Sequence, residues 1–123
     1  MLKVHAKNLG TANVLCLQGQ IVIGDTETLR NAVQSLSGTS AVILDLARVT
    51  TVDAHGLGVM LELREWTQER GIRFELMNVS QPMSRVLEIT RLDSVFQITS
   101  GVEFFPQVAR DSRARVAALR PCA

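Results

Sequence analysis

A chain of 123 residues can build one hydrophobic core, and it is too short for two domains of ordinary size. Hydrophobic residues make up 46% and charged residues 20% of the chain, which excludes a disordered or collagen-like protein. The formal net charge of +1 supplies no basic field for nucleic acid, and the apolar run at residues 56–61 is too short to cross a bilayer. We therefore expect a cytoplasmic protein that binds no nucleic acid and does not insert into a membrane.

The first third of the chain predicts a β-hairpin followed by a helix. Short apolar stretches at residues 2–8 and 13–20 are separated by the turn-forming Gly10. Asp25 is the candidate N-cap of a helix that ends near residue 37. Four apolar residues recur in that helix at the spacing of one helical face: Leu29, Ala32, Val33 and Leu36.

The middle of the chain predicts a strand, a helix and a second strand. Residues 41–46 (AVILDL) are almost continuously apolar, as in a strand covered on both faces, and residues 48–53 (RVTTVD) are interpreted as a turn. A helix is predicted over about residues 54–70 and a strand over residues 72–79. Because these three elements follow one another, they are predicted to form one right-handed βαβ unit.

The last part of the chain is predicted to complete the domain. Ser80 starts a third helix, residues 95–98 form an edge strand, and a last helix starts near residue 105. We therefore predict one domain over residues 1–109 and a basic C-terminal tail over residues 110–123.

The segment around Asp53 stands out because an aspartate precedes small residues, two glycines and a strongly apolar helix. The Asp53 carboxylate can accept hydrogen bonds from the free N–H groups of the first helical turn. Gly56 and Gly58 each cost about 1 kcal/mol relative to alanine inside a helix. Either close packing on the sheet or close approach of a partner must therefore require the bare backbone there.

The segment LDLARVTTVDAHGLGVML resembles the signature of bacterial anti-sigma factor antagonists of the STAS domain family, in which a strand precedes Asp-Ser, a small residue, Gly-Leu-Gly and a helix. The likeness is specific at Asp53, Gly56, Leu57 and Gly58 and extends more loosely over most of the chain. It implies an α/β, STAS-like fold with a four- to five-stranded mixed sheet and about four helices, mainly on one face. It also implies a partner, an anti-sigma factor that is itself a serine kinase of the switch type.

In the family that this chain resembles, the residue after the aspartate is a serine that the partner kinase phosphorylates, and phosphorylation releases the complex. Here that residue is Ala54, which has no hydroxyl to accept a phosphoryl group. The resemblance therefore predicts an antagonist-like interaction domain that binds an anti-sigma factor and regulates sigma-dependent transcription without the usual switch.

Other residues near the missing serine offer alternatives. His55 could accept a phosphoryl group or form a pH-sensitive contact, as histidine side chains do in other proteins, but an exposed polar residue in a first helical turn is the simpler interpretation. Thr50 and Thr51 lie in the predicted turn and not at the acceptor position. Asp45 and Asp53 could form a carboxylate pair, yet a strand end and a helix cap explain them more simply.

Apolar residues on the predicted second helix point to two roughly opposite sides, with Leu57, Met60 and Leu61 on one side and Val59, Leu63 and Trp66 on the other. One sheet cannot bury both groups, so either neighbouring helices cover the rest or an apolar docking patch remains. The predicted partner-binding residues are Asp25, Asp53, Ala54, His55, Gly56, Leu57, Gly58, Met60 and Leu61.

The leading hypothesis is a constitutive antagonist, which stays bound to its anti-sigma factor because it cannot be phosphorylated, and several alternative functions remain open. STAS-like domains without the serine also serve as accessory subunits of ABC-type lipid transporters, so a transporter ATPase is an alternative partner, and a stressosome-like scaffold or a homodimer is another arrangement. Nucleotide phosphate could bind at the helix N-termini near Asp25 and Ala54, but the chain has no P-loop or dinucleotide fingerprint. No Ser/His/Asp, Cys/His or metal-ligand set can be assembled, so we expect no enzyme and no cofactor.

Three further residues carry expectations about local structure. Cys16 and Cys122 have no CxxC spacing and no accompanying histidine cluster, so we predict two separate, reduced thiols. In the third helix Arg91 stands where the family commonly has a glycine, and a left-handed arginine costs about 1 kcal/mol, so we expect a different local turn.

Overall fold

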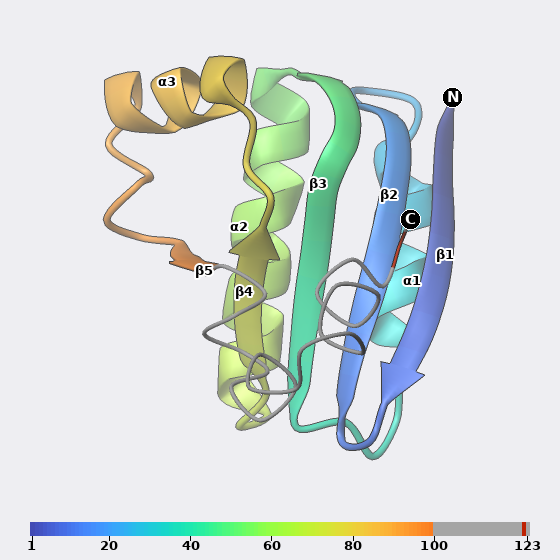
Figure 1. Ribbon diagram of the computed structural model, residues 1–123. Helices are drawn as coiled ribbons and strands as arrows, with labels where there is room; N and C mark the ends of the chain where they lie inside the picture. Colours follow the sequence, from blue (N-terminus) through green and yellow to red (C-terminus); the bar gives the residue numbers. More distant parts are fainter. Residues whose placement is uncertain (100–121, 123) are drawn as a thin grey trace, which may run out of the picture.

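The computed structural model describes residues 1–99 and residue 122. They form one five-stranded sheet in the order β1-β2-β3-β4-β5, in which β1 and β2 are antiparallel and all later neighbours are parallel (Figure 1). The strands are β1 (Leu2–Leu9), β2 (Ala12–Ile21), β3 (Ala41–Val52), β4 (Arg73–Met77) and β5 (Gln97–Thr99), and the helices are α1 (Thr26–Gln34), α2 (Ala54–Glu69) and α3 (Gln81–Ile89). The predicted α/β class, opening hairpin and central βαβ unit are confirmed.

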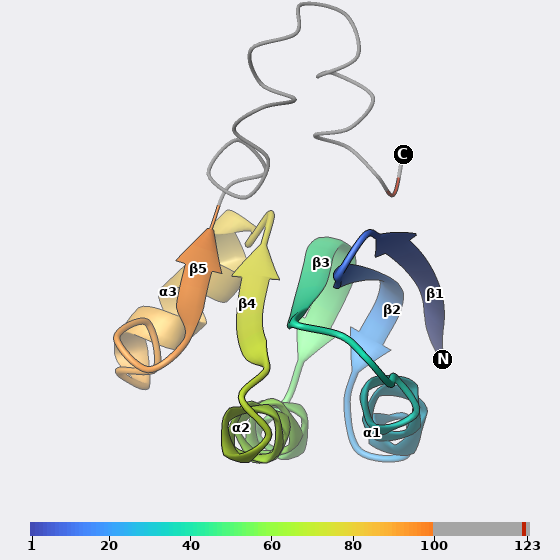
Figure 2. The same cartoon turned by 90° about the horizontal axis from the view of Figure 1, so that it is seen from below.

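The helices α1 and α2 lie side by side on one face of the sheet, and α3 lies beyond β4 beside β5 (Figure 2). The main core fills the space between the sheet and the helices, because alternate residues of the central strands point toward the helices. Leu29 and Val33 of α1 and Met60 and Leu63 of α2 are fully buried in it. Three helices are described. The expected fourth helix, the domain end at residue 109 and the tail 110–123, apart from Cys122, lie outside the described residues.

Strand β3 is longer than the sequence predicts. Residues 48–53 were interpreted as a turn, but the strand continues to Val52, so Thr50 and Thr51 are strand residues. Two register shifts against β2, between Cys16 and Gln18 and between Gly19 and Gln20, keep the two strands paired over this length. Such irregularities bend a strand without ending it, which explains why turn-forming residues did not mark its end.

Cys16 and Cys122 form a disulfide, with Cα atoms 5.5 Å apart, so the prediction of two separate reduced thiols is wrong. The two residues are 106 positions apart in the sequence, and spacing along the chain carries no information about such a long-range pair.

The end of α3 also differs from expectation. Arg91 adopts the left-handed conformation with φ of 61°, the conformation whose cost to an arginine led us to expect another turn. The Leu92 N–H reaches back to the Leu87 carbonyl at 2.8 Å, the bond that closes a helix after a left-handed residue. The expectation of a different local turn is therefore wrong.

Candidate functional site

The start of α2 meets the end of β2 at Asp53, which is the N-cap that the sequence predicts. Its extended backbone precedes the helix, and its Oδ1 accepts the Gly56 N–H at 2.7 Å. Its Oδ2 accepts a second bond, from the Ile23 N–H at 3.0 Å. One carboxylate therefore holds both the first turn of α2 and the loop that joins β2 to α1.

These two hydrogen bonds stabilise the charged form of the Asp53 carboxyl group. The N–H groups of Ile23 and, next, of Gly56 lower the pKa of the Asp53 carboxyl, and partial burial opposes them. A carboxylate that accepts backbone N–H bonds is stabilised in its charged form. Asp53 thus places a fixed negative charge beside Ala54 under ordinary conditions.

Gly56 and Gly58 occupy different environments, although both belong to the Gly-Leu-Gly segment. A Cβ at Gly56 would lie 2.0 Å from the carbonyl oxygen of Ile21, so this glycine lets α2 touch the end of β2. A Cβ at Gly58 would meet nothing within 4 Å. Close packing therefore explains Gly56, while Gly58 is exposed and its packing gives no reason for glycine.

Ala54 and His55 begin α2, and both are exposed. Ala54 and Gly58 are four residues apart and so lie on the same face of the helix. The His55 Nε2 lies 3.0 Å from the hydroxyl of Thr26, the buried first residue of α1. This contact joins the first turns of the two helices.

The sequence also predicts that the loop of residues 19–25 takes part in partner binding, and within this loop the structure points to Ile23, which was not among the predicted partner-binding residues. Its backbone is fixed by Asp53, yet its side chain is 71% exposed. A large apolar side chain on a loop directly before a Gly-Asp turn was the available signal. We call the exposed group formed by Ile23, Gly24, Ala54, His55 and Gly58 the Ala54 surface.

Asp25 takes the N-cap position of α1, as predicted, but its side chain makes no capping hydrogen bond. Its carboxylate instead lies 3.4 Å from the amino group of Met1. The two helices are joined by another pair, in which the Arg30 Nε donates to the Glu62 carboxylate at 2.7 Å. This hydrogen bond is the main reason that the pKa of Glu62 is lowered.

The sequence left open whether neighbouring elements cover both apolar sides of α2 or an apolar docking patch remains. In the described part of the chain, the large apolar residues of this helix are buried or half-buried against the main core. Met60 is fully buried and Leu57 is 8% exposed, so these two predicted partner-binding side chains present little surface to a partner. Leu61 and Trp66 are half-buried against the same core. Ile23, on the neighbouring loop that Asp53 holds, exposes a large apolar side chain near the start of α2.

Comparison with known proteins places this geometry in a family, because residues 3–110 match the STAS domain. The chain belongs to that family. A curated STAS-domain containing protein of Pseudomonas aeruginosa is 26% identical over 84 residues, which cover 68% of this chain and 83% of that protein.

Two solved structures show the same STAS fold. An anti-sigma factor antagonist from Mycobacterium paratuberculosis superimposes with a TM-score of 0.74 and 18% identity, over 90% of this chain and 96% of that one. The Bacillus cell fate determinant SpoIIAA in its phosphorylated form gives a TM-score of 0.65 and 18% identity, over 86% of this chain and 99% of that one. At these identities the likeness concerns the fold.

The described residues contain neither a metal-ligand cluster nor a membrane-spanning helix. Within residues 1–99 and 122, no three or more histidine, cysteine, aspartate or glutamate side chains gather as a metal site would require. No helix in the same residues is long and apolar enough to span a bilayer.

Proposed function

We propose that this STAS domain binds an anti-sigma factor of the switch-kinase type through the Ala54 surface and so regulates sigma-dependent transcription in the cytoplasm. The observation that carries the proposal is the anchored start of α2, where Asp53 fixes both the first helical turn and the Ile23 loop. A rigid, exposed patch with one apolar residue at its edge suits a protein partner better than a small ligand.

The missing hydroxyl makes the proposed complex constitutive. A phosphoryl group at residue 54 would add nearly two negative charges beside the Asp53 carboxylate, which is already held in its charged form. Ala54 cannot accept that group, so a kinase partner could not end the complex by modifying this residue. The domain would therefore keep its partner engaged when phosphorylatable relatives release theirs.

The first experiment captures partners from native lysate on the wild-type chain and on Ala54→Asp, with mass spectrometry to identify them. Ala6→Asp is the matched control, because Ala6 is an exposed alanine on β1 outside the Ala54 surface. We expect a kinase-type anti-sigma factor on wild type and on the control, with binding to Ala54→Asp weakened at least about 10-fold by charge repulsion. Equal capture by all three chains would refute the proposed surface.

The purified partner then allows a gain-of-function test. Ala54→Ser restores the hydroxyl, so with ATP the variant should gain one phosphoryl group and lose the partner, whereas wild type should stay unmodified and bound. Ile23→Asp should weaken binding to the same partner without ATP. Phosphorylation of wild type, or release of wild type by ATP, would contradict the constitutive complex.

The same missing hydroxyl favours a second candidate, an accessory subunit of an ABC-type lipid transporter, because such subunits need no phosphorylation switch. The capture experiment separates the two candidates directly. Recovery of a transporter ATPase in place of a kinase would establish the second and overturn the first.

A further inference from the structure

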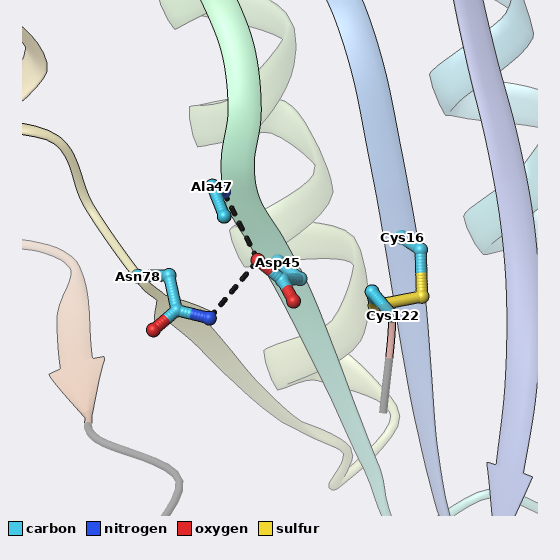
Figure 3. The surroundings of a disulfide bond; sticks show 5 residues. All are labelled: Cys16, Asp45, Ala47, Asn78 and Cys122. Atoms are coloured by element: carbon cyan, nitrogen blue, oxygen red, sulfur yellow. Dashed lines mark hydrogen bonds between the residues drawn. A yellow bond between two sulfur atoms is a disulfide. The ribbon is translucent and has the colours of Figure 1, made fainter. Parts of the chain in front are cut away.

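The Cys16–Cys122 disulfide lies on the face of the sheet that points away from α1 and α2 (Figure 3). Cys16 is in the middle of β2, directly opposite His5 of β1 and Asp45 of β3. Both cysteines line a cavity of about 680 Å³ that extends over β1, β2 and β3. Pockets for small molecules have volumes of about 300–1,000 Å³, so a small ligand can reach the disulfide.

The cavity carries an excess of positive charge. Lys3, Lys7 and Arg48 line it, and Asp45 is the carboxylate among its described lining residues. Within the described part of the chain, none of these three cations forms an ion pair. Asp45 is engaged, since its Oδ1 accepts from the Ala47 N–H at 3.0 Å and from the Asn78 amide at 3.2 Å (Figure 3).

A disulfide in a cytoplasmic protein is usually transient and redox-sensing, because the cytoplasm keeps thiols reduced. That this disulfide is transient rests on the cytoplasmic function proposed above. Cys16 and Cys122 pack on one side against a small apolar cluster of the sheet, but each is only half-buried and also lines the charged cavity, where a thiol can reach the bond. Position and surroundings therefore suit a bond that forms and breaks.

We propose that Cys16 and Cys122 form a reversible redox switch, and that the cationic cavity binds the anionic low-molecular-weight thiol that reduces it. The thiolate of this reductant attacks the Cys122 sulfur, the bond to Cys16 breaks, and Cys16 leaves as a thiolate into the cavity that Lys3, Lys7 and Arg48 also line. A second reductant thiolate attacks the reductant sulfur of the mixed disulfide and releases Cys122. In total, two thiols become one small disulfide, and the protein gains two electrons and two protons.

The charge of the reductant provides the test, with glutathione as the anionic probe and cysteamine as the cationic one. The oxidised, purified chain is mixed with each thiol under native conditions, and loss of the disulfide is followed by mass spectrometry after acid quenching. Rates are expressed per thiolate, relative to a short unfolded peptide disulfide. We expect the folded chain to favour glutathione by about 10-fold, the lower range of electrostatic steering in a charged cleft.

Paired variants show whether the cavity causes that preference. Lys3→Gln combined with Lys7→Gln should abolish it, while Arg64→Gln combined with Arg85→Gln, with the same net charge, should retain it. The proposal is overturned if the oxidised chain contains two free thiols, if millimolar glutathione leaves the native disulfide intact, or if both pairs behave alike. The assay contains no partner protein, so failure of the proposed anti-sigma complex would not change its result.

Discussion

The two glycines at the start of α2 provide a paired test of how this helix meets the sheet. Alanine is favoured over glycine inside a helix by about 1 kcal/mol, so both substitutions carry the same intrinsic gain. At Gly58 nothing opposes that gain, because the new methyl group meets no atom within 4 Å. We therefore expect Gly58→Ala to raise the free energy of unfolding by about 0.5–1 kcal/mol.

At Gly56 the same methyl group would lie 2.0 Å from the Ile21 carbonyl oxygen, where contacts under 3.0 Å do not occur. The start of α2 and the end of β2 must therefore separate by about 1.0 Å, the difference between the two distances. Overpacking of this kind costs about 1–3 kcal/mol, and a backbone oxygen cannot rotate away, which favours the upper end. We expect a net loss of about 2 kcal/mol for Gly56→Ala.

Urea unfolding of the two variants and wild type measures the difference. A gap of about 3 kcal/mol between the variants corresponds to about 1.5 M urea in the midpoint, for a slope of about 2 kcal/mol/M. If Gly58 is a glycine because a partner approaches it, Gly58→Ala should also weaken partner binding while it stabilises the fold. Equal stability of Gly56→Ala and wild type would refute the close approach of α2 to β2.

Three further changes test other parts of the structure. The pKa of Asp53 is lowered in the folded state, so its carboxylate stabilises the fold at pH values above the ordinary pKa of 3.8, and this stabilisation is lost as the pH falls below that value. The variant Asp53→Asn should therefore unfold at lower urea than wild type near neutral pH, and its urea midpoint should depend less on pH. Parallel curves of urea midpoint against pH for the two proteins would contradict this. Arg91→Gly should raise the free energy of unfolding, measured by thermal unfolding, by up to about 1 kcal/mol, because glycine adopts a φ of 61° at lower cost than arginine. A lower stability of the variant would show that the arginine side chain stabilises the fold. Cys16→Ser removes a disulfide between residues 106 positions apart and should lower the free energy of unfolding by up to about 5 kcal/mol in the absence of reductant. An unchanged urea midpoint would argue against the disulfide.

The local parts of the site could be predicted from the sequence because they depend on neighbouring residues. Asp53 caps the helix that follows it, and its bond to Gly56 spans three residues. The alternation of strands and helices is a local pattern as well, and it predicted the hairpin and the βαβ unit. The strand end at Val52 was missed, since register shifts against β2 extend the strand through residues that favour turns.

The burial of the α2 residues depended on tertiary packing. The sequence showed two apolar sides on this helix and left open whether neighbours cover both. In the structure, Leu61 and Trp66 are half-buried against the main core and the other four of these residues are buried in it, so neighbouring elements cover both sides in the described part of α2. Periodicity gives the direction in which a side chain points, and only the packed neighbours determine what it meets.

The sequence by itself determined the STAS family, the helix cap at Asp53 and the lack of a hydroxyl at residue 54, because each is a matter of residue identity and short spacing. The tertiary structure alone decided that Gly56 touches Ile21, that Asp53 fixes Ile23 at a separation of 30 residues, and that Cys16 meets Cys122. These contacts join segments that are distant in the chain, and their geometry follows from how the strands and helices pack, which no local pattern encodes.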